Sequence, residues 1–110
     1  MNNNNTEAVE SVFHELGGGI KGAEASKMFG VPTYKINTKA FMCLMNDHAV
    51  FKLTGDDHES AMAHKGAALF DPSGMNRPMK EWVQLGVEHK KKWSFYAESA
   101  LKYVKKTAKK

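Results

Sequence analysis

Six side chains in this 110-residue chain have the types that nucleophilic or zinc chemistry needs, namely one cysteine and five histidines. A catalytic cysteine requires a base and a partly exposed, electropositive setting that favours the thiolate. Cys43 instead lies between Met42 and Leu44 in an apolar run, which predicts a small core residue. Zinc-binding helices place two histidines at i and i+4, whereas His58 and His64 are six residues apart. We therefore expect neither a catalytic thiol nor a bound metal.

Two further segments have the composition of a catalytic or phosphate site without its pattern. Residues 17–22 read Gly-Gly-Gly-Ile-Lys-Gly. A phosphate loop follows a strand and ends in Gly-Lys-Ser/Thr, so this run predicts a helix cap and a connector instead. Asp56 and Asp57 follow Thr54, which is typical of a capping box rather than of paired catalytic carboxylates. Because no serine lies in a Gly-x-Ser-x-Gly elbow either, we expect no enzyme activity and no cofactor.

Positive charge collects at the C-terminal end of the chain. The formal net charge is +4, and the last six residues contain four lysines: Lys105, Lys106, Lys109 and Lys110. Without them bases and acids balance, so the body of the chain is neutral. A basic helix end complements the helix dipole, and a solvated tail is the simplest interpretation. The alternative is a weak nucleic-acid interface formed with Lys52, Arg77 and Lys80, whose affinity would fall ~100-fold between 50 and 200 mM salt.

The elements that must position these residues follow from hydrophobic periodicity. Apolar residues recur at helical spacing over residues 7–16 and again around Trp93 over residues 88–106. The expected strands lie at 23–29, 33–36, 40–45, 49–53, 67–70 and 79–85, with a short helix over 56–65. This order predicts an α+β fold, an antiparallel sheet with helices packed on one face. The domain spans 7–106, between a disordered N-terminus at 1–6 and a basic tail at 107–110.

Two strands carry more apolar residues than one covered face can hold. Alternation puts Trp82 on the face opposite Val83 and Leu85, and the central strand has the same surplus at Met42 and Leu44. If the helices cover only one face, Trp82, Met42 and Leu44 are exposed on the other. Large exposed apolar patches mark interaction surfaces, so this face predicts a protein partner or a homodimer. The alternative is a β-bulge that turns Trp82 into the core.

Composition also bears on the compartment. No apolar run approaches the ~18 residues of a membrane span. The asparagine-rich N-terminus has neither the basic nor the apolar region of a signal peptide. A single cysteine fits a reducing compartment, so we expect a cytoplasmic protein without a membrane partner.

Short motifs in a fixed order resemble the TfoX/Sxy N-terminal domain family. They are Lys27-Met28-Phe29-Gly30, the meander closing on Phe51-Lys52-Leu53, and Arg77-Pro78-Met79-Lys80-Glu81-Trp82 before a Trp- and Ala-bearing terminal helix. The resemblance covers about residues 7–106 and implies a two-layer fold of the YjbR-like or secretion-chaperone-like kind. The family's named members are bacterial transcriptional coregulators of competence that carry a second, helical C-terminal domain, whereas many members similar to this chain are stand-alone domains of unknown role. The resemblance therefore implies a stand-alone domain, with a transcriptional coregulator as the function to expect. It supplies no catalytic residues.

Three functions stay open on these grounds. The favoured one is a non-enzymatic protein-binding module that acts through Trp82, Met42 and Leu44. The second is the weak nucleic-acid binder described above. The third is a small-ligand binder or an enzyme of unknown reaction, with a pocket between the sheet and the last helix. An exposed apolar face, a basic surface or a cleft that gathers ionisable groups would distinguish them.

Overall fold

The computed structural model describes residues 2–28, 30–45, 48–71 and 79–108. The elements in chain order are α1 (Asn2–Gly18), β1 (Glu24–Met28), β2 (Val31–Ile36), β3 (Lys39–Met45), β4 (His48–Lys52), α2 (Gly55–Met62), β5 (Ala68–Phe70), β6 (Met79–Gly86), the 3-10 helix η1 (Val87–His89) and α3 (Lys90–Ala108). Helix α1 begins at Asn2 rather than at the expected Glu7, and so includes part of the stretch for which the sequence predicts disorder. The residues at 1, 29, 46–47, 72–78 and 109–110 lie outside the described part.

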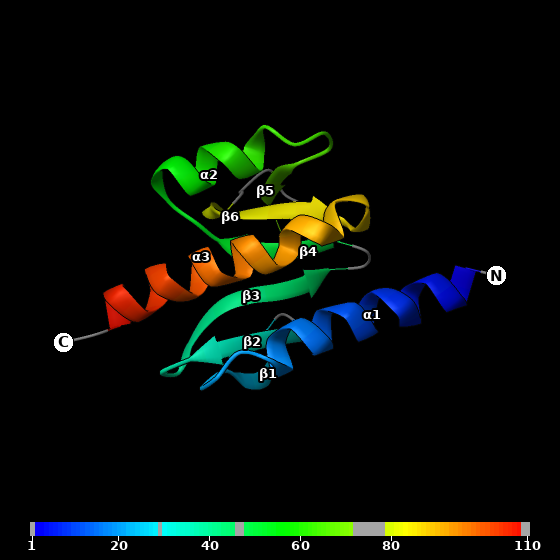
Figure 1. Ribbon diagram of the computed structural model, residues 1–110, viewed down its shortest axis with the longest axis horizontal. Helices are drawn as coiled ribbons and strands as arrows, with labels where there is room; N and C mark the ends of the chain where they lie inside the picture. Colours follow the sequence, from blue (N-terminus) through cyan, green and yellow to red (C-terminus); the bar gives the residue numbers. More distant parts are fainter. Residues whose placement is uncertain (1, 29, 46–47, 72–78, 109–110) are drawn as a thin grey trace.

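The strands form one six-stranded sheet in the order β1-β2-β3-β4-β6-β5, and every neighbouring pair is antiparallel. Helices α1 and α3 lie across the same face, while α2 lies beside β6 near the β5 edge (Figure 1). Between β2 and β3 the turn residues Asn37 and Thr38 have φ values of 52° and 68°. Positive φ at both central residues is the signature of a tight hairpin turn whose twist matches the flanking strands. The α+β prediction is therefore confirmed.

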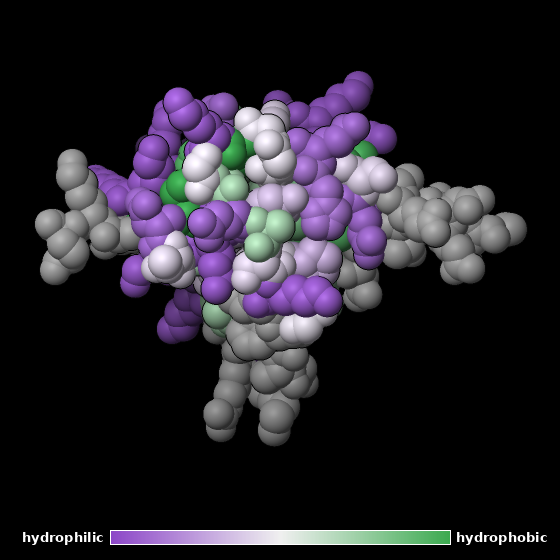
Figure 2. All heavy atoms as spheres, turned by 90° about the horizontal axis from the view of Figure 1, so that it is seen from below, coloured by the Kyte–Doolittle hydropathy of each residue, from purple (hydrophilic) through white to green (hydrophobic). Residues whose placement is uncertain are grey.

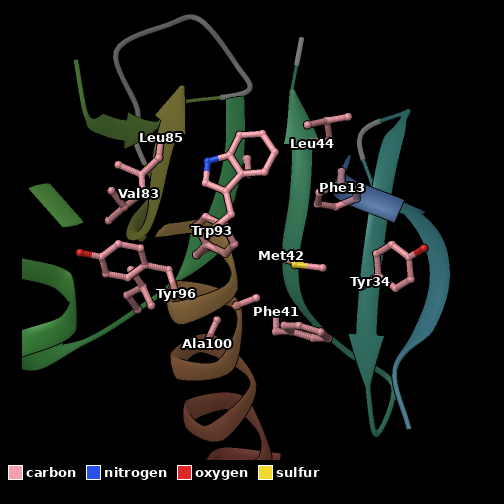
Figure 3. Packing of buried hydrophobic residues seen from close by; sticks show 14 of the residues in the cluster. Phe13, Tyr34, Phe41, Met42, Leu44, Val83, Leu85, Trp93, Tyr96 and Ala100 are labelled. Atoms are coloured by element: carbon pink, nitrogen blue, oxygen red, sulfur yellow. The ribbon is translucent and has the colours of Figure 1, made fainter. Parts of the chain in front are cut away.

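The main core lies between the sheet and the two long helices. Trp93, Tyr96 and Ala100 project from α3 toward the strands, as the helical periodicity predicts (Figure 3). Phe13 joins this core from α1, and its ring meets the Tyr34 ring edge to face at 5.5 Å between centroids. Gly17 makes this approach feasible, because a Cβ atom there would lie 2.4 Å from Cε1 of Tyr34.

A β-bulge in β3 changes which residues face the helices. Tyr34 pairs with Met42, but the next residue, Lys35, pairs with Ala40, so Phe41 is the extra residue. The bulge lets both Phe41 and Met42 join the core under the helices, and Leu44 follows on the same face. Met42 is 0 % exposed and Leu44 is 2 % exposed. The expectation that these two residues lie exposed is wrong, because they pair with Phe51 and Ala49 and so lie on the face that the helices cover.

A second, smaller core lies on the opposite face of the sheet. Its buried members are Cys43, Val50, Phe70 and Trp82, with Val31, Ala40, Met45 and Met79 packed against them. Trp82 does lie opposite Val83 and Leu85, as predicted, but it is only 6 % exposed. The register between β5 and β6 shifts so that Phe70 pairs with Met79. Phe70 and Met79 both belong to or pack against the second core. The expected exposed position of Trp82 is therefore also wrong.

Helix α2 starts near its predicted position but without the predicted cap. Thr54 is the N-cap residue in an extended conformation, and its side chain makes no capping hydrogen bond. Asp56 and Asp57 lie in the first turn, where their charges favour the positive end of the helix dipole. The helix ends at Met62, three residues before the predicted end.

Candidate functional site

The outward face of α3 is strongly basic. The helix contains six lysines and a single acidic residue, Glu98. Its inward positions are apolar and buried, so the lysines occupy the remaining faces. Lys102, Lys105 and Lys106 are all exposed and lie within the last two turns. They also lie close to the negative end of the helix dipole, which stabilises positive charge there.

Two shallow hollows run beside these lysines. One, of about 430 Å³, lies between α3 and the connector after α1; it is lined by Gly19, Ile20, Lys21, Glu98, Leu101, Lys102 and Lys105. The other, of about 590 Å³, is lined by Asn37, Lys102, Lys105 and Lys106. Because the two share Lys102 and Lys105, we treat them as one feature. We call it the lysine groove, defined by Lys21, Lys102, Lys105 and Lys106.

The connector between α1 and β1 holds Lys21 beside α3. Backbone hydrogen bonds fold it into consecutive turns, from Ile20 N to Gly17 O at 3.2 Å and from Ala23 N to Ile20 O at 3.2 Å. Ile20 and Leu101 are partly buried against the main core, which holds the connector to the helix. The glycine run is thus a helix end and a connector, as predicted. It also contributes a cation to a groove, which the sequence did not predict.

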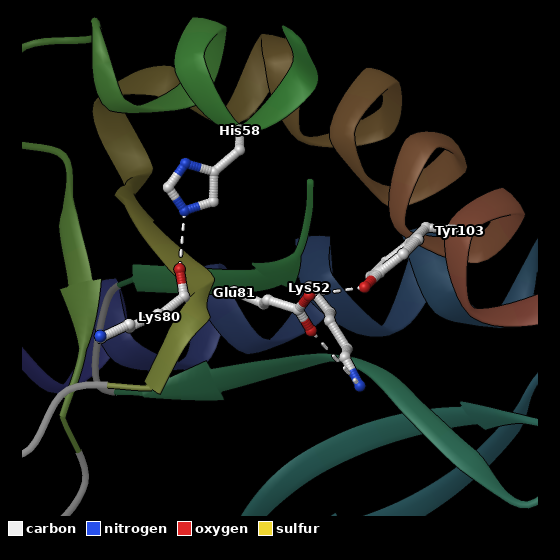
Figure 4. Close-up of polar contacts among 5 residues, drawn as sticks. All are labelled: Lys52, His58, Lys80, Glu81 and Tyr103. Atoms are coloured by element: carbon white, nitrogen blue, oxygen red, sulfur yellow. Dashed lines mark hydrogen bonds and ion pairs between the residues drawn. The ribbon is translucent and has the colours of Figure 1, made fainter. Parts of the chain in front are cut away.

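The structure separates the basic residues that the sequence grouped together. Lys105 and Lys106 line the groove, whereas Nζ of Lys52 lies 4.0 Å from Oε1 of Glu81 on β6. Lys80 is exposed on β6, where its carbonyl oxygen accepts a hydrogen bond from Nε2 of His58 at 2.7 Å (Figure 4). The predicted site residues Arg77, Lys109 and Lys110 lie outside the described residues.

Glu81 is the centre of a small polar contact between β4, β6 and α3. The hydroxyl of Tyr103 donates a hydrogen bond to its Oε2 at 2.6 Å, opposite the contact with Lys52 (Figure 4). This hydrogen bond is the main cause that raises the pKa of Tyr103 above its ordinary value. The acid partly neutralises Lys52, which weakens the case for Lys52 as a phosphate ligand.

Lys21 and Lys102 are groove residues that sequence reasoning missed. Lys102 could have been found, because it lies three and four residues before Lys105 and Lys106 and so shares their helix face. Lys21 carries no such local signal. It is 81 residues from Lys102, and only the packing of the connector on α3 brings the two together.

The residues proposed for a partner surface and for thiol chemistry are all buried. Trp82, Met42 and Leu44 belong to the two cores and present no exposed apolar face. Cys43 is fully buried, and burial raises the pKa of its thiol to about 12. The thiol is therefore protonated at neutral pH and inert as a nucleophile.

A polar cluster joins α2 to η1 and α3. The Tyr96 hydroxyl lies 2.7 Å from Oγ of Ser60 and 3.1 Å from Nε2 of His64. The His64 ring lies 4.8 Å from that of His89, whose Nε2 donates to the carbonyl oxygen of Lys65 at 2.8 Å. These hydrogen bonds connect elements within the chain, which indicates a structural role. Within the described ranges, no three His, Cys, Asp or Glu side chains are grouped to hold a metal ion.

Comparisons with protein-family models, with curated proteins and with solved structures found no match. In the part of the chain that the structure describes, no helix combines the length and the apolar character needed to cross a membrane. The lysine groove is therefore the feature on which a function can be argued.

Proposed function

We propose that this protein binds nucleic acid weakly through the lysine groove. The observation that carries the proposal is the convergence of Lys21, from the connector, with Lys102 and Lys105 of α3 along one hollow. Lys106 extends the same positive surface toward the β2–β3 turn. Lysines act as point charges on phosphates, and such contacts supply most of the affinity of nonspecific binding.

The shape and charge of the groove support a polyanion over a small molecule. Both hollows are shallow, and their described lining holds lysines and one carboxylate, Glu98, with no histidine, cysteine or aspartate beside it. Seen from the β1 edge, hydrophilic residues make up much of the coloured surface, with some hydrophobic residues between them (Figure 2). A chain of phosphates can follow such an open basic surface without being enclosed.

This activity is compatible with the regulatory role that the resemblance to the TfoX/Sxy N-terminal domain implies. A transcriptional coregulator that contacts nucleic acid weakly would add affinity to a larger assembly. The apolar sheet face expected from the sequence does not support a partner surface, because its three predicted residues are buried. We therefore place the interaction on the helical side of the molecule.

The test is a salt titration of the affinity for labelled DNA. Four groove lysines on phosphates predict a slope of log K against log salt of about −3.6 for a duplex. Replacing Lys102 and Lys105 together by alanine should make that slope less steep, by about two, and should weaken binding at low salt.

The matched control is Lys65→Ala, an exposed lysine after α2 that does not line the groove. This variant should bind like the original chain. If the groove variant kept the original slope, or if Lys65→Ala lost as much affinity, the proposed function would be wrong.

A further inference from the structure

The exposed ring of Phe95 points to the class of nucleic acid that the groove takes. We propose that Phe95 is a stacking platform for an unpaired base, so that the ligand is single-stranded. This inference rests on the proposed function, and it adds the substrate class. It starts from a residue that the packing of α3 leaves unexplained.

Phe95 is 54 % exposed, although it lies in a helix whose other aromatic residues face inward or partly inward. Trp93 and Tyr96 on either side of it are buried at 1 % and 2 % exposure. Among the described residues the other large hydrophobic side chain with comparable exposure is Met62, at 36 %. The Phe95 ring meets the buried Tyr96 ring edge to face at 5.0 Å, which limits its freedom. A partly held, solvent-facing ring loses little entropy when a base stacks on it.

Helix geometry places Phe95 in line with the groove. Seven residues are almost two full turns, so Phe95 and Lys102 share one face of α3, about 10.5 Å apart along its axis. Lys91 lies one turn before Phe95 on that face and is exposed. Along α3 the ring therefore lies between Lys91, one turn before it, and the lysine groove, which begins after it. A strand whose phosphates follow the lysines would pass the ring.

The surroundings of Phe95 favour a nucleic acid over a protein. The core of a protein interface is depleted in lysine and combines several apolar residues. On this face of α3 the neighbours of Phe95 at helical spacing are Lys91, Lys92, Glu98 and Ser99, and Lys102 follows one turn later. An isolated aromatic ring whose charged neighbours are mainly lysines is instead the arrangement that single-strand binders use, where each base offers a π-face.

A single strand fits better than a duplex for a geometric reason. In a duplex both faces of each base are already covered by stacking, so a side chain on a helix surface reaches only phosphates and groove edges. An unpaired base can turn onto the ring without that cost. Phe95 should therefore add affinity for single strands and none for duplexes.

The experiment compares two variants on three probes at low salt. The probes are labelled oligothymidylate and oligouridylate of about 16 nucleotides and a duplex of equal length, measured by fluorescence anisotropy. We expect Phe95→Ala to bind both single strands about 5-fold or more weakly, with duplex affinity unchanged. Phe95→Trp, which keeps an aromatic ring, should bind both single strands as tightly as the original chain does. The comparison of the two single-stranded probes shows whether the protein binds DNA or RNA more tightly.

Met62→Ala is the matched control, because Met62, on α2, is the other exposed large hydrophobic residue among those described. This variant should leave the affinity for all three probes unchanged. If Phe95→Ala binds single strands as well as the original chain, or loses single-strand and duplex affinity equally, the stacking role is overturned. In that case a loss of affinity in the Lys102 and Lys105 variant would still support the proposed function. If the original chain binds none of the three probes, the proposed function and the stacking role both fail.

Discussion

Cys43 illustrates how burial decides the chemistry of a single side chain. The residue lies in β3 on the face of the second core, with Val50 and Trp82 as fellow members. Taking the thiolate out of water disfavours the charged form, and burial raises the pKa of the thiol from 9.0 to about 12. The prediction of a small core residue is confirmed, and its physical consequence is an unreactive thiol.

The raised pKa predicts a loss of stability at alkaline pH. Below about pH 9 the thiol is protonated in the folded and the unfolded chain, so it contributes no pH dependence. Between about pH 9 and 12 the unfolded chain releases the proton while the folded chain keeps it, so this group lowers the free energy of unfolding as pH rises. The free energy of unfolding of the original chain and of Cys43→Ala can be measured in urea across this range. The difference between the two should become smaller as pH rises. A constant difference would contradict the raised pKa.

At the scale of elements, two adjacent glycines at the end of α1 have opposite roles. A Cβ atom on Gly17 would lie 2.4–2.5 Å from three ring carbons of Tyr34. A Cβ atom on Gly18 would meet no atom within 4 Å. Gly17 thus permits the packing of α1 on β2, whereas Gly18 only weakens the helix. Both residues belong to a run that the sequence marks merely as a helix end.

This contrast predicts changes of opposite sign in the free energy of unfolding. Gly17→Ala should destabilise the protein by ~1–3 kcal/mol, because α1 or the Tyr34 ring must move. Gly18→Ala should be neutral or stabilise by up to ~1 kcal/mol, since alanine is the better helix former. Urea unfolding of the two variants measures both. Equal effects would show that Tyr34 does not contact the helix closely.

For the whole molecule, the decisive feature is that the sheet buries apolar residues on both faces. The larger core lies under α1 and α3, and the smaller one gathers Trp82 and Phe70 on the other side. An aromatic residue buried to this degree contributes to folding and is not available to a partner. The proposed interaction surface is therefore the exposed side of α3 and not the sheet.

Replacement of Trp82 tests this arrangement. Trp82→Ala should destabilise the chain by ~3–5 kcal/mol, because it leaves a large cavity in the second core. Phe95→Ala, at an exposed aromatic position, should change stability by no more than ~0.5 kcal/mol. Chemical denaturation gives the two values, and sedimentation of the original chain and of Trp82→Ala reports whether association changes. A change in association without a loss of stability would show that Trp82 is exposed and contacts a second molecule.

Local patterns in the sequence were sufficient for much of the architecture. The helical spacing around Trp93 identified the buried face of α3, because it depends on neighbours within one element. The alternation along β6 correctly separated Trp82 from Val83. The concentration of lysine at the C-terminal end was likewise visible from residue types alone.

The tertiary structure decided what pairing between distant segments controls. The extra residue at Phe41 becomes visible only when β3 is paired with β2, and the pairing of β3 with β4 places Met42 and Leu44 on the face that the helices cover. The lysine groove likewise depends on the contact of the connector with α3, which brings Lys21 to Lys102. The periodicity of apolar side chains is a property of one segment. Strand register and the formation of a groove depend on how two segments pack against each other. Sequence alone therefore determined the elements and their charge, and packing determined which faces are free to bind.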